Sequence, residues 1–182
     1  MKIILGITGA SGAIYGYTLL RLLHAKGVQT DLILTAMGEK VLQYECGISR
    51  QDLAGYATLY DNDNLFAPIA SGSCLCDGMV VAPCSMNTLG LMANGLGGTL
   101  LTRCAAVTLK EQRPLVLLTR ETPLNTIQIE NMLRAARAGA VVMPASPGFY
   151  QKPQHMSELI AGVVFRVLDQ LNIPAEEASR WK

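Results

Sequence analysis

Cationic and acidic side chains that can act on phosphates are spaced through the second half of the chain. Arg103 and Lys110 are seven residues apart, which puts them on one face if this segment is helical. Arg120 and Glu121 follow an apolar run, and Arg166 lies in the last segment with helical spacing. Together these cations would neutralise a phosphate, whereas each alone is more often a solvated or salt-bridged surface residue. Glu121 fits either an acid–base group or a counter-ion for the arginines.

A glycine-rich turn near the start of the chain can also hold a phosphate. It reads Gly9-Ala10-Ser11-Gly12 and joins the apolar run Ile3–Ile7 to a segment with helical spacing, Ala13–Lys26. A strand that enters a helix through glycines aims free N–H groups and the positive helix end at one point. Ser11 is placed to cap that helix or to donate to an anion. The spacing is not GxGxxG, so a turn that only lets the helix pack on the strand explains the stretch equally well.

A second polar turn lies where another helix is expected to start, and it reads Pro83-Cys84-Ser85-Met86-Asn87-Thr88. It can cradle a phosphate or contact the edge of a flavin ring, or it can simply cap the helix. Cys84 would need a base to act as a nucleophile, and the histidines, His24 and His155, are both distant in sequence. The second expected strand ends in Thr35-Ala36, without the acidic residue that holds an NAD ribose, so a mononucleotide such as FMN fits better.

The elements that must position these residues alternate between strand and helix. We expect strands at Ile3–Ile7, Gln29–Ala36, Gly78–Cys84, Pro114–Arg120 and Ala140–Ala145. We expect helices at Ala13–Lys26, Glu39–Cys46, Ser49–Leu53, from about Leu89, Thr99–Gln112, Asn125–Ala138 and His155–Leu171, with Gly55–Ser73 irregular. This alternation predicts an α/β fold of one domain, 1–182, with a doubly wound (Rossmann-like or flavodoxin-like) parallel sheet flanked by helices. Ligands of such sheets bind beyond the carboxyl ends of the strands, where both turns lie.

The chain carries few charges for its size. Half of its 182 residues are hydrophobic and 16% are charged, against about 25% in a typical soluble domain. So few charges indicate that much of the surface is covered, and a homo-oligomer is the simplest arrangement. The tail, about 173–182, is expected to pack on the body or on a neighbouring subunit. The net charge of +1 gives no case for a nucleic-acid or membrane-surface partner.

The cysteines and the acidic turns do not suggest a metal. Five cysteines without framework spacing fit a reducing cytoplasm, and Cys74 and Cys76 have no histidine nearby to complete a zinc site. Asp61-Asn62-Asp63 is interpreted as plain turn chemistry, because no second acidic cluster supports Mg²⁺. We expect no secretory signal, and no membrane span in the uncharged stretch 78–102, which proline and glycines interrupt.

Seven sequence blocks, in order, resemble the UbiX-type flavin prenyltransferases. The blocks are Gly9-Ala10-Ser11-Gly12-Ala13 with Tyr15-Gly16, Ala70-Ser71-Gly72-Ser73, Pro83-Cys84-Ser85, Leu109-Lys110-Glu111 with Arg113–Leu117, Arg120-Glu121-Thr122-Pro123-Leu124, Glu130–Leu133 and Pro147-Gly148-Phe149-Tyr150. The resemblance implies transfer of a dimethylallyl group from dimethylallyl phosphate to N5 and C6 of reduced FMN, without a metal. It implies that the product, prenylated FMN, serves a UbiD-type decarboxylase, and that the site forms between subunits of a homododecamer.

The resemblance also implies roles for individual residues. FMN would contact Gly9, Ala10, Ser11, Thr35, Ser85, Met86, Asn87, Thr88 and Arg120. The prenyl phosphate would contact Arg103, Lys110, Arg120, Glu121, Tyr150 and Arg166. Ser11 and Glu45 would manage a proton near the flavin N5, while Lys110 and Glu121 would act on the donor side. One position departs from the family, since many members carry tryptophan where this chain has Leu65.

Two other functions compete with this one. Flavin-dependent cysteinyl decarboxylases share the fold and a turn similar to Pro83–Thr88, but they depend on a histidine in the first half of the chain. Here that half contains only His24, on the expected first helix and away from the strand ends. A non-catalytic FMN-binding subunit is the other alternative, and it would have no need of a second phosphate site.

Overall fold

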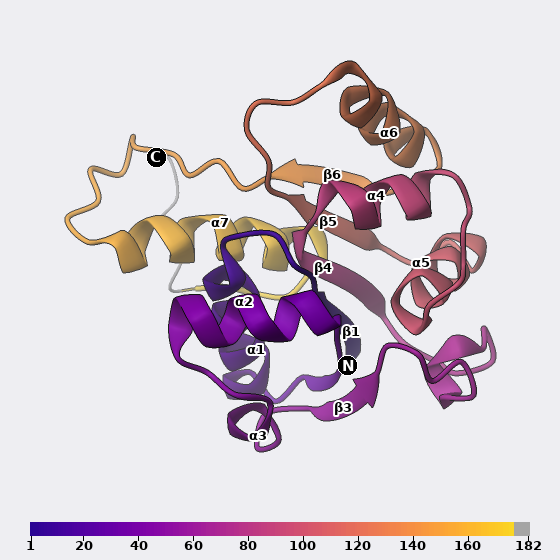
Figure 1. Cartoon of the computed structure of the whole chain (residues 1–182). Coiled ribbons are helices and arrows are strands. Elements are labelled where there is room, and N and C mark those ends of the chain that lie inside the picture. Colours follow the sequence, from indigo (N-terminus) through magenta and orange to yellow (C-terminus); the bar gives the residue numbers. More distant parts are fainter. Residues whose placement is uncertain (177–182) are drawn as a thin grey trace.

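A six-stranded parallel sheet forms the centre of the molecule (Figure 1). The computed structural model describes residues 1–176. The strand order is β3-β2-β1-β4-β5-β6, so the direction of winding reverses between β1 and β4. The strands are β1 (Lys2–Ile7), β2 (Gln29–Leu34), β3 (Thr58–Asp61), β4 (Gly78–Cys84), β5 (Leu115–Thr119) and β6 (Val141–Pro144).

Helices cover both faces of the sheet, as expected when each crossover between parallel strands is right-handed. One face is covered by α1 (Ala13–Ala25), α2 (Ala36–Cys46) and α7 (Met156–Gln170), with the short α3 (Arg50–Leu53) beside them. The other is covered by α4 (Met86–Ala93), α5 (Leu100–Lys110) and α6 (Thr126–Arg137), with the 3-10 turn η1 (Pro68–Ala70). The predicted doubly wound α/β fold is confirmed.

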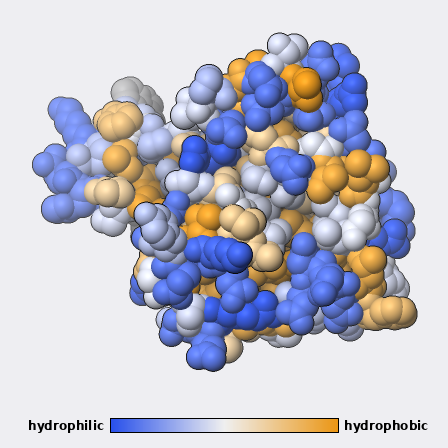
Figure 2. All heavy atoms as spheres, viewed as in Figure 1, coloured by the Kyte–Doolittle hydropathy of each residue, from blue (hydrophilic) through white to orange (hydrophobic). Residues whose placement is uncertain are grey.

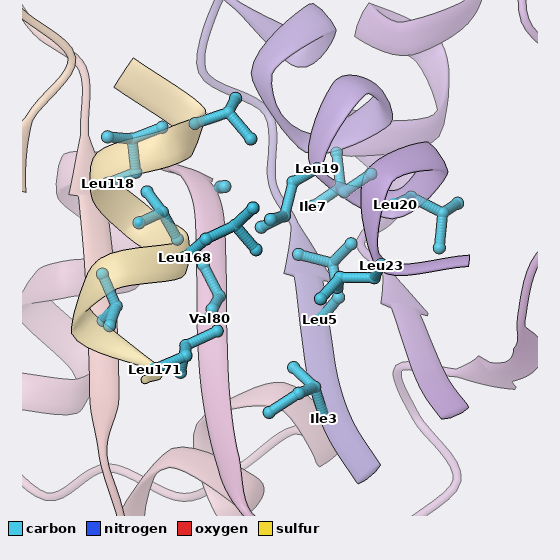
Figure 3. Close-up of a cluster of buried hydrophobic side chains, with 14 of the residues drawn as sticks. Ile3, Leu5, Ile7, Leu19, Leu20, Leu23, Val80, Leu118, Leu168 and Leu171 are labelled. Carbon is cyan, nitrogen blue, oxygen red and sulfur yellow. The ribbon is translucent and has the colours of Figure 1, made fainter. Parts of the chain in front are cut away.

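Two hydrophobic cores lie on either side of the sheet because alternate strand residues point to opposite faces. In Figure 3, Leu5 of β1 points toward Leu23 of α1, and Val80 of β4 lies beside Leu168 of α7. The opposite core contains Ile4, Met79, Val81, Leu101 and Cys104. Strands buried on both faces need continuous apolar sequence, and β4 is buried along its whole length.

Several element boundaries differ from those predicted. Gly55–Ser73 is not wholly irregular, since it contains β3 and η1. The second strand ends at Leu34 rather than Ala36, because the Thr35 side chain accepts from the Gly38 N–H and starts α2 there. In the same way Ser85 caps α4, so this helix begins at Met86 rather than near Leu89. Both corrections arise from a polar residue that ends a strand and caps the next helix.

The segment between β6 and α7 projects from the body of the molecule (Figure 1). In this segment Phe149 is 68% exposed and Tyr150 is 54% exposed.

Apolar patches interrupt the hydrophilic surface on the face shown in Figure 2. Beyond α7, Ile173 and Ala175 are buried, while 177–182 of the predicted packed tail lie outside the described residues. Within residues 1–176, no helix combines the length and the hydrophobicity that crossing a bilayer requires.

Candidate functional site

A cleft of about 480 Å³ opens at the carboxyl ends of the strands. Its position beside the reversal in strand order is the usual ligand site of open α/β sheets. Five of the predicted cofactor residues line it, namely Gly9, Thr35, Ser85, Asn87 and Thr88. Gly9 brings its loop against α2 so closely that an added Cβ would lie 2.6 Å from the Met37 Cβ.

Three helices begin at this cleft. Thr35 and Met37 belong to the start of α2, Asn87 to the start of α4, and Thr99 and Leu101 to the start of α5. Within residues 1–176 the backbone N–H groups of Met37 and Asn87 have no hydrogen-bond acceptor. Free N–H groups at positive helix ends favour an anion, so the starts of α2 and α4 suit a phosphate.

A buried threonine joins the two central strands below the cleft. The Thr8 hydroxyl donates to the Pro83 carbonyl oxygen at 2.7 Å and accepts from the Ser85 N–H at 2.9 Å. The Ser85 hydroxyl in turn donates to the Thr88 Oγ1 at 3.0 Å. Because Thr8 is only 1% exposed, both of its hydrogen bonds are shielded from water and fix the Ser85–Thr88 turn relative to β1.

Ser11, Glu45 and Arg120 form a charged cluster at the start of α1. One Glu45 carboxylate oxygen accepts from the Gly12 N–H at 2.8 Å and from the Ala13 N–H at 3.0 Å. Arg120 donates from Nε to the Ser11 carbonyl oxygen at 3.0 Å. Glu45 thus occupies the N–H groups of Gly12 and Ala13 at the start of α1, while the contacts of Gly9, Ala10 and Ser11 with FMN stay a prediction.

The same cluster changes the titration of Glu45. Partial burial alone would raise the pKa of this carboxyl group, but hydrogen bonds from Ser11, Gly12 and Ala13 and the charge of Arg120 hold the pKa below its usual value. Ser11 was expected either to cap this helix or to donate to an anion, and it does not cap the helix. The cap is Gly12, whose φ of 98° is left-handed, and the Ser11 side chain bonds Glu45 instead.

The remaining predicted cofactor residues lie close to the cleft without lining it. Ala10 and Met86 are buried immediately next to lining residues. Glu121 follows Arg120 at the end of β5, is exposed, and accepts from its own neighbour, the Thr122 N–H, at 3.0 Å. The carboxyl edge of the sheet therefore holds the predicted nucleotide-binding residues, the Ser11 cluster and Glu121.

The other predicted donor-binding residues do not converge on the cleft within one chain. Lys110 lies at the far end of α5, about 12 Å along the helix axis from Thr102, and pairs with Glu111 at 2.6 Å. Arg103 donates to the Ala70 carbonyl oxygen at 3.1 Å. It lines a second groove of about 560 Å³ together with Leu65, Phe66 and Gly97.

Arg166 and Tyr150 lie in α7 and in the segment that precedes it. Arg166 lies on α7 and pairs with Asp169 at 2.7 Å. Tyr150 lies in the segment between β6 and α7. Within one chain these cations do not line a single cleft, so their contact with the prenyl phosphate stays a prediction about a site formed between subunits.

The chain matches known proteins along nearly its whole length. The model of the Flavoprotein family covers residues 1–165. A probable UbiX-like flavin prenyltransferase of Bacillus subtilis is 45% identical over 182 residues, which cover 100% of this chain and 89% of that protein. The flavin prenyltransferase UbiX of Methanocaldococcus jannaschii is 44% identical over 182 residues, covering 100% and 98%.

Solved structures agree with these sequence matches. AnUbiX (PadA1), in complex with FMN and dimethylallyl pyrophosphate, has a TM-score of 0.97 at 38% identity, covering 100% of this chain and 97% of that one. A dodecameric FMN-dependent UbiX-like decarboxylase from Escherichia coli O157:H7 has a TM-score of 0.97 at 41% identity, covering 100% of both chains. The chain belongs to the UbiX-type flavoproteins. The family suggested by the sequence blocks is thus confirmed.

This UbiX-type chain has cleft residues that the sequence did not indicate. Asn62, Leu91, Leu101, Thr99 and Thr102 also line the cleft. Asn62 directly follows β3, the strand that was missed, and so it obeys the same rule about carboxyl ends. The alternating stretch Thr58–Asp61, followed by a polar turn, was the signal that could have found it.

Cys84 is no nucleophile in this UbiX-type site, because complete burial raises the pKa of its thiol to about 12. His24 lies in the last turn of α1, with its ring 5.1 Å from that of Tyr56 and away from the cleft. No group of three or more His, Cys, Asp or Glu side chains among residues 1–176 could hold a metal ion.

Proposed function

We propose that this protein is a flavin prenyltransferase that joins a dimethylallyl group from dimethylallyl phosphate to N5 and C6 of reduced FMN. The observation that supports this most is the near-complete structural match to AnUbiX, which is bound to FMN and dimethylallyl pyrophosphate. Across the reaction the donor's carbon–oxygen bond and its carbon–carbon π bond are replaced by bonds to N5 and C6. The N5 proton leaves with inorganic phosphate, and the proton lost from C6 is balanced by one gained at the former alkene carbon.

The cleft residues fit FMN. Free N–H groups at the starts of α2 and α4 suit its phosphate, and the Ser85 and Thr88 hydroxyls and the Asn87 amide suit its polar groups. The volume of about 480 Å³ is typical of small-molecule sites. When bound, reduced FMN supplies the electron-rich ring atoms that accept the prenyl group.

The charged residues have separate tasks in this proposal. Arg120, Lys110 and Arg166, with the Tyr150 hydroxyl, stabilise the negative charge that develops on the departing phosphate. Holding the donor beside the flavin supplies proximity. Ser11 and Glu45 manage the proton near N5, and Glu121 or the released phosphate accepts the proton lost on ring closure.

Assembly completes the site. Lys110, Tyr150 and Arg166 do not line the cleft of their own chain, so we place them in the sites of neighbouring subunits. The Escherichia coli relative is dodecameric, and we extend that assembly to this chain. The exposed apolar residues Phe149, Met156 and Ile127 would be covered in it.

The product, prenylated FMN, would serve a UbiD-type decarboxylase. The five free cysteines fit a protein that acts in a reducing cytoplasm.

The cysteinyl decarboxylase alternative is weaker, because His24 lies away from the cleft. The likeness to PPC decarboxylase, at 20% identity and a TM-score of 0.67, shows a shared fold alone.

Phosphate release tests this function. The protein with reduced FMN and dimethylallyl phosphate, kept anaerobic and in EDTA, should release one phosphate per flavin. Oxidised FMN should give none. Release without flavin would indicate a phosphatase, and no release with reduced FMN would contradict the proposal.

A further inference from the structure

The carboxamide of Asn62 is fixed by the helix that it faces. Its Oδ1 accepts from the Leu101 N–H at 3.0 Å, and its backbone oxygen accepts from the Leu100 N–H at 2.7 Å. These are the first two N–H groups of α5, and Thr99 caps the third, that of Thr102. The start of α5 is thus satisfied by the protein itself.

In the described part of the chain, the side-chain nitrogen of Asn62 carries two N–H donors that remain available. Because a backbone N–H must face an acceptor, the contact with Leu101 assigns Oδ1 to that side and the nitrogen to the opposite side. Within residues 1–176, the Asn62 Nδ2 has no acceptor, while Asn62 itself lines the cleft. A partly buried amide with unused donors in a ligand cleft is suited to an acceptor on the ligand.

We infer that Asn62 is a nucleotide-binding residue, whose side-chain N–H groups donate to an acceptor oxygen of the bound flavin. The inference rests on the proposed function, because it takes FMN as the occupant of the cleft. Asn62 would have two roles, since its oxygen holds α5 in place and its nitrogen binds the ligand. It would contact the ligand from the side of β3 and the start of α5.

The substitution Asn62→Asp keeps the oxygen that holds α5 and removes the nitrogen that would bind the ligand. A carboxylate still accepts from Leu101 N–H and suits a helix start, so the unfolding midpoint should stay at or above that of the wild type. The donors are lost and a charge faces the ligand, so FMN should bind about tenfold more weakly or worse. Asn62→Ala removes both functions and should lower both stability and affinity.

A neighbouring residue provides the matched control. The Asn64 Oδ1 accepts from the Phe66 N–H at 3.2 Å, and Asn64 does not line the cleft. Asn64→Asp adds the same charge to the same loop and keeps that bond, so FMN affinity should stay within about twofold of wild type. The difference between the two Asp variants separates an effect at the cleft from the effect of an added charge elsewhere in the loop.

The experiment is a fluorescence titration of FMN and of riboflavin into the wild type, Asn62→Asp, Asn62→Ala and Asn64→Asp, with urea unfolding of each. Weaker binding of both ligands by the Asn62 variants places the acceptor on the ring or ribityl chain, and weaker binding of FMN alone places it on the phosphate. Wild-type affinity in Asn62→Ala, or equal losses in both Asp variants, would overturn the assignment. A wild type that binds no FMN would instead overturn the proposed function, and this inference with it.

Discussion

At the scale of single residues, the Glu45 carboxylate in the cluster with Ser11 and Arg120 accepts the N–H groups at the start of α1 that a capping side chain would otherwise accept. Glu45 lies 33 residues after Gly12 in sequence and accepts its N–H. A negative group at a helix start is stabilised by the helix dipole, by about 0.3–1 kcal/mol at an exposed site. The same interactions keep Glu45 ionised for its proposed role near the flavin.

The lowered pKa of Glu45 predicts a pH-dependent contribution to stability. Partial burial opposes the ionised form, but hydrogen bonds from Ser11, Gly12 and Ala13 and the charge of Arg120 outweigh it, so the folded pKa is below the unfolded one. The stabilisation is then present above the unfolded value of about 4.3 and is lost as the pH falls through the lower folded value. Glu45→Gln should lower the free energy of unfolding near pH 7 by about 0.3–1 kcal/mol and by less near pH 3.

Urea unfolding of both proteins at the two pH values measures this effect. A difference that is the same at pH 7 and pH 3 would show that the Glu45 charge contributes nothing at the helix start.

At the scale of elements, the starts of α2 and α4 carry the proposed phosphate seat. Ser85→Ala removes the α4 cap and should cost about 1 kcal/mol of stability, while also weakening FMN binding. Ser49→Ala removes the cap of α3, which lies away from the cleft, and should cost a similar amount with unchanged FMN affinity. Urea unfolding and FMN titration test the pair, and equal effects of both variants on affinity would contradict the seat at α4.

Sequence patterns predicted those elements whose signals are local. A continuous apolar run such as Gly78–Cys84 predicts a buried strand. A polar residue directly after a strand, such as Thr35 after β2 or Ser85 after β4, predicts the position of the cleft. The short edge strand β3 was missed because its four residues are only partly buried and lie among turn residues, and Asn62 was lost with it. No local pattern connects Glu45 to Gly12, because only the packing of α2 beside α1 brings them together.

At the scale of the whole molecule, the cleft of one chain contains predicted nucleotide-binding residues but not the full set of predicted donor-binding residues. Lys110 ends α5 and Arg166 lies on α7, and neither lines the cleft. Few charges and exposed apolar side chains agree with subunits that cover one another. A site shared between subunits explains these observations together.

Mixed oligomers test the shared site. Arg120→Ala and Lys110→Ala should each be nearly inactive alone, because each lacks part of every site. If the two residues come from different subunits, co-assembled variants contain some complete sites and should recover a fraction of wild-type activity. No recovery in verified mixed oligomers, or full activity in an isolated monomer, would place Arg120 and Lys110 in one chain's site.

The central claim is that the protein attaches a five-carbon group to FMN. The most direct test is the mass of flavin extracted after the protein, reduced FMN and dimethylallyl phosphate react without oxygen. We predict flavin heavier by one prenyl unit, in an amount that rises with protein concentration. Unmodified FMN after prolonged incubation of folded, flavin-bound oligomer would contradict the account.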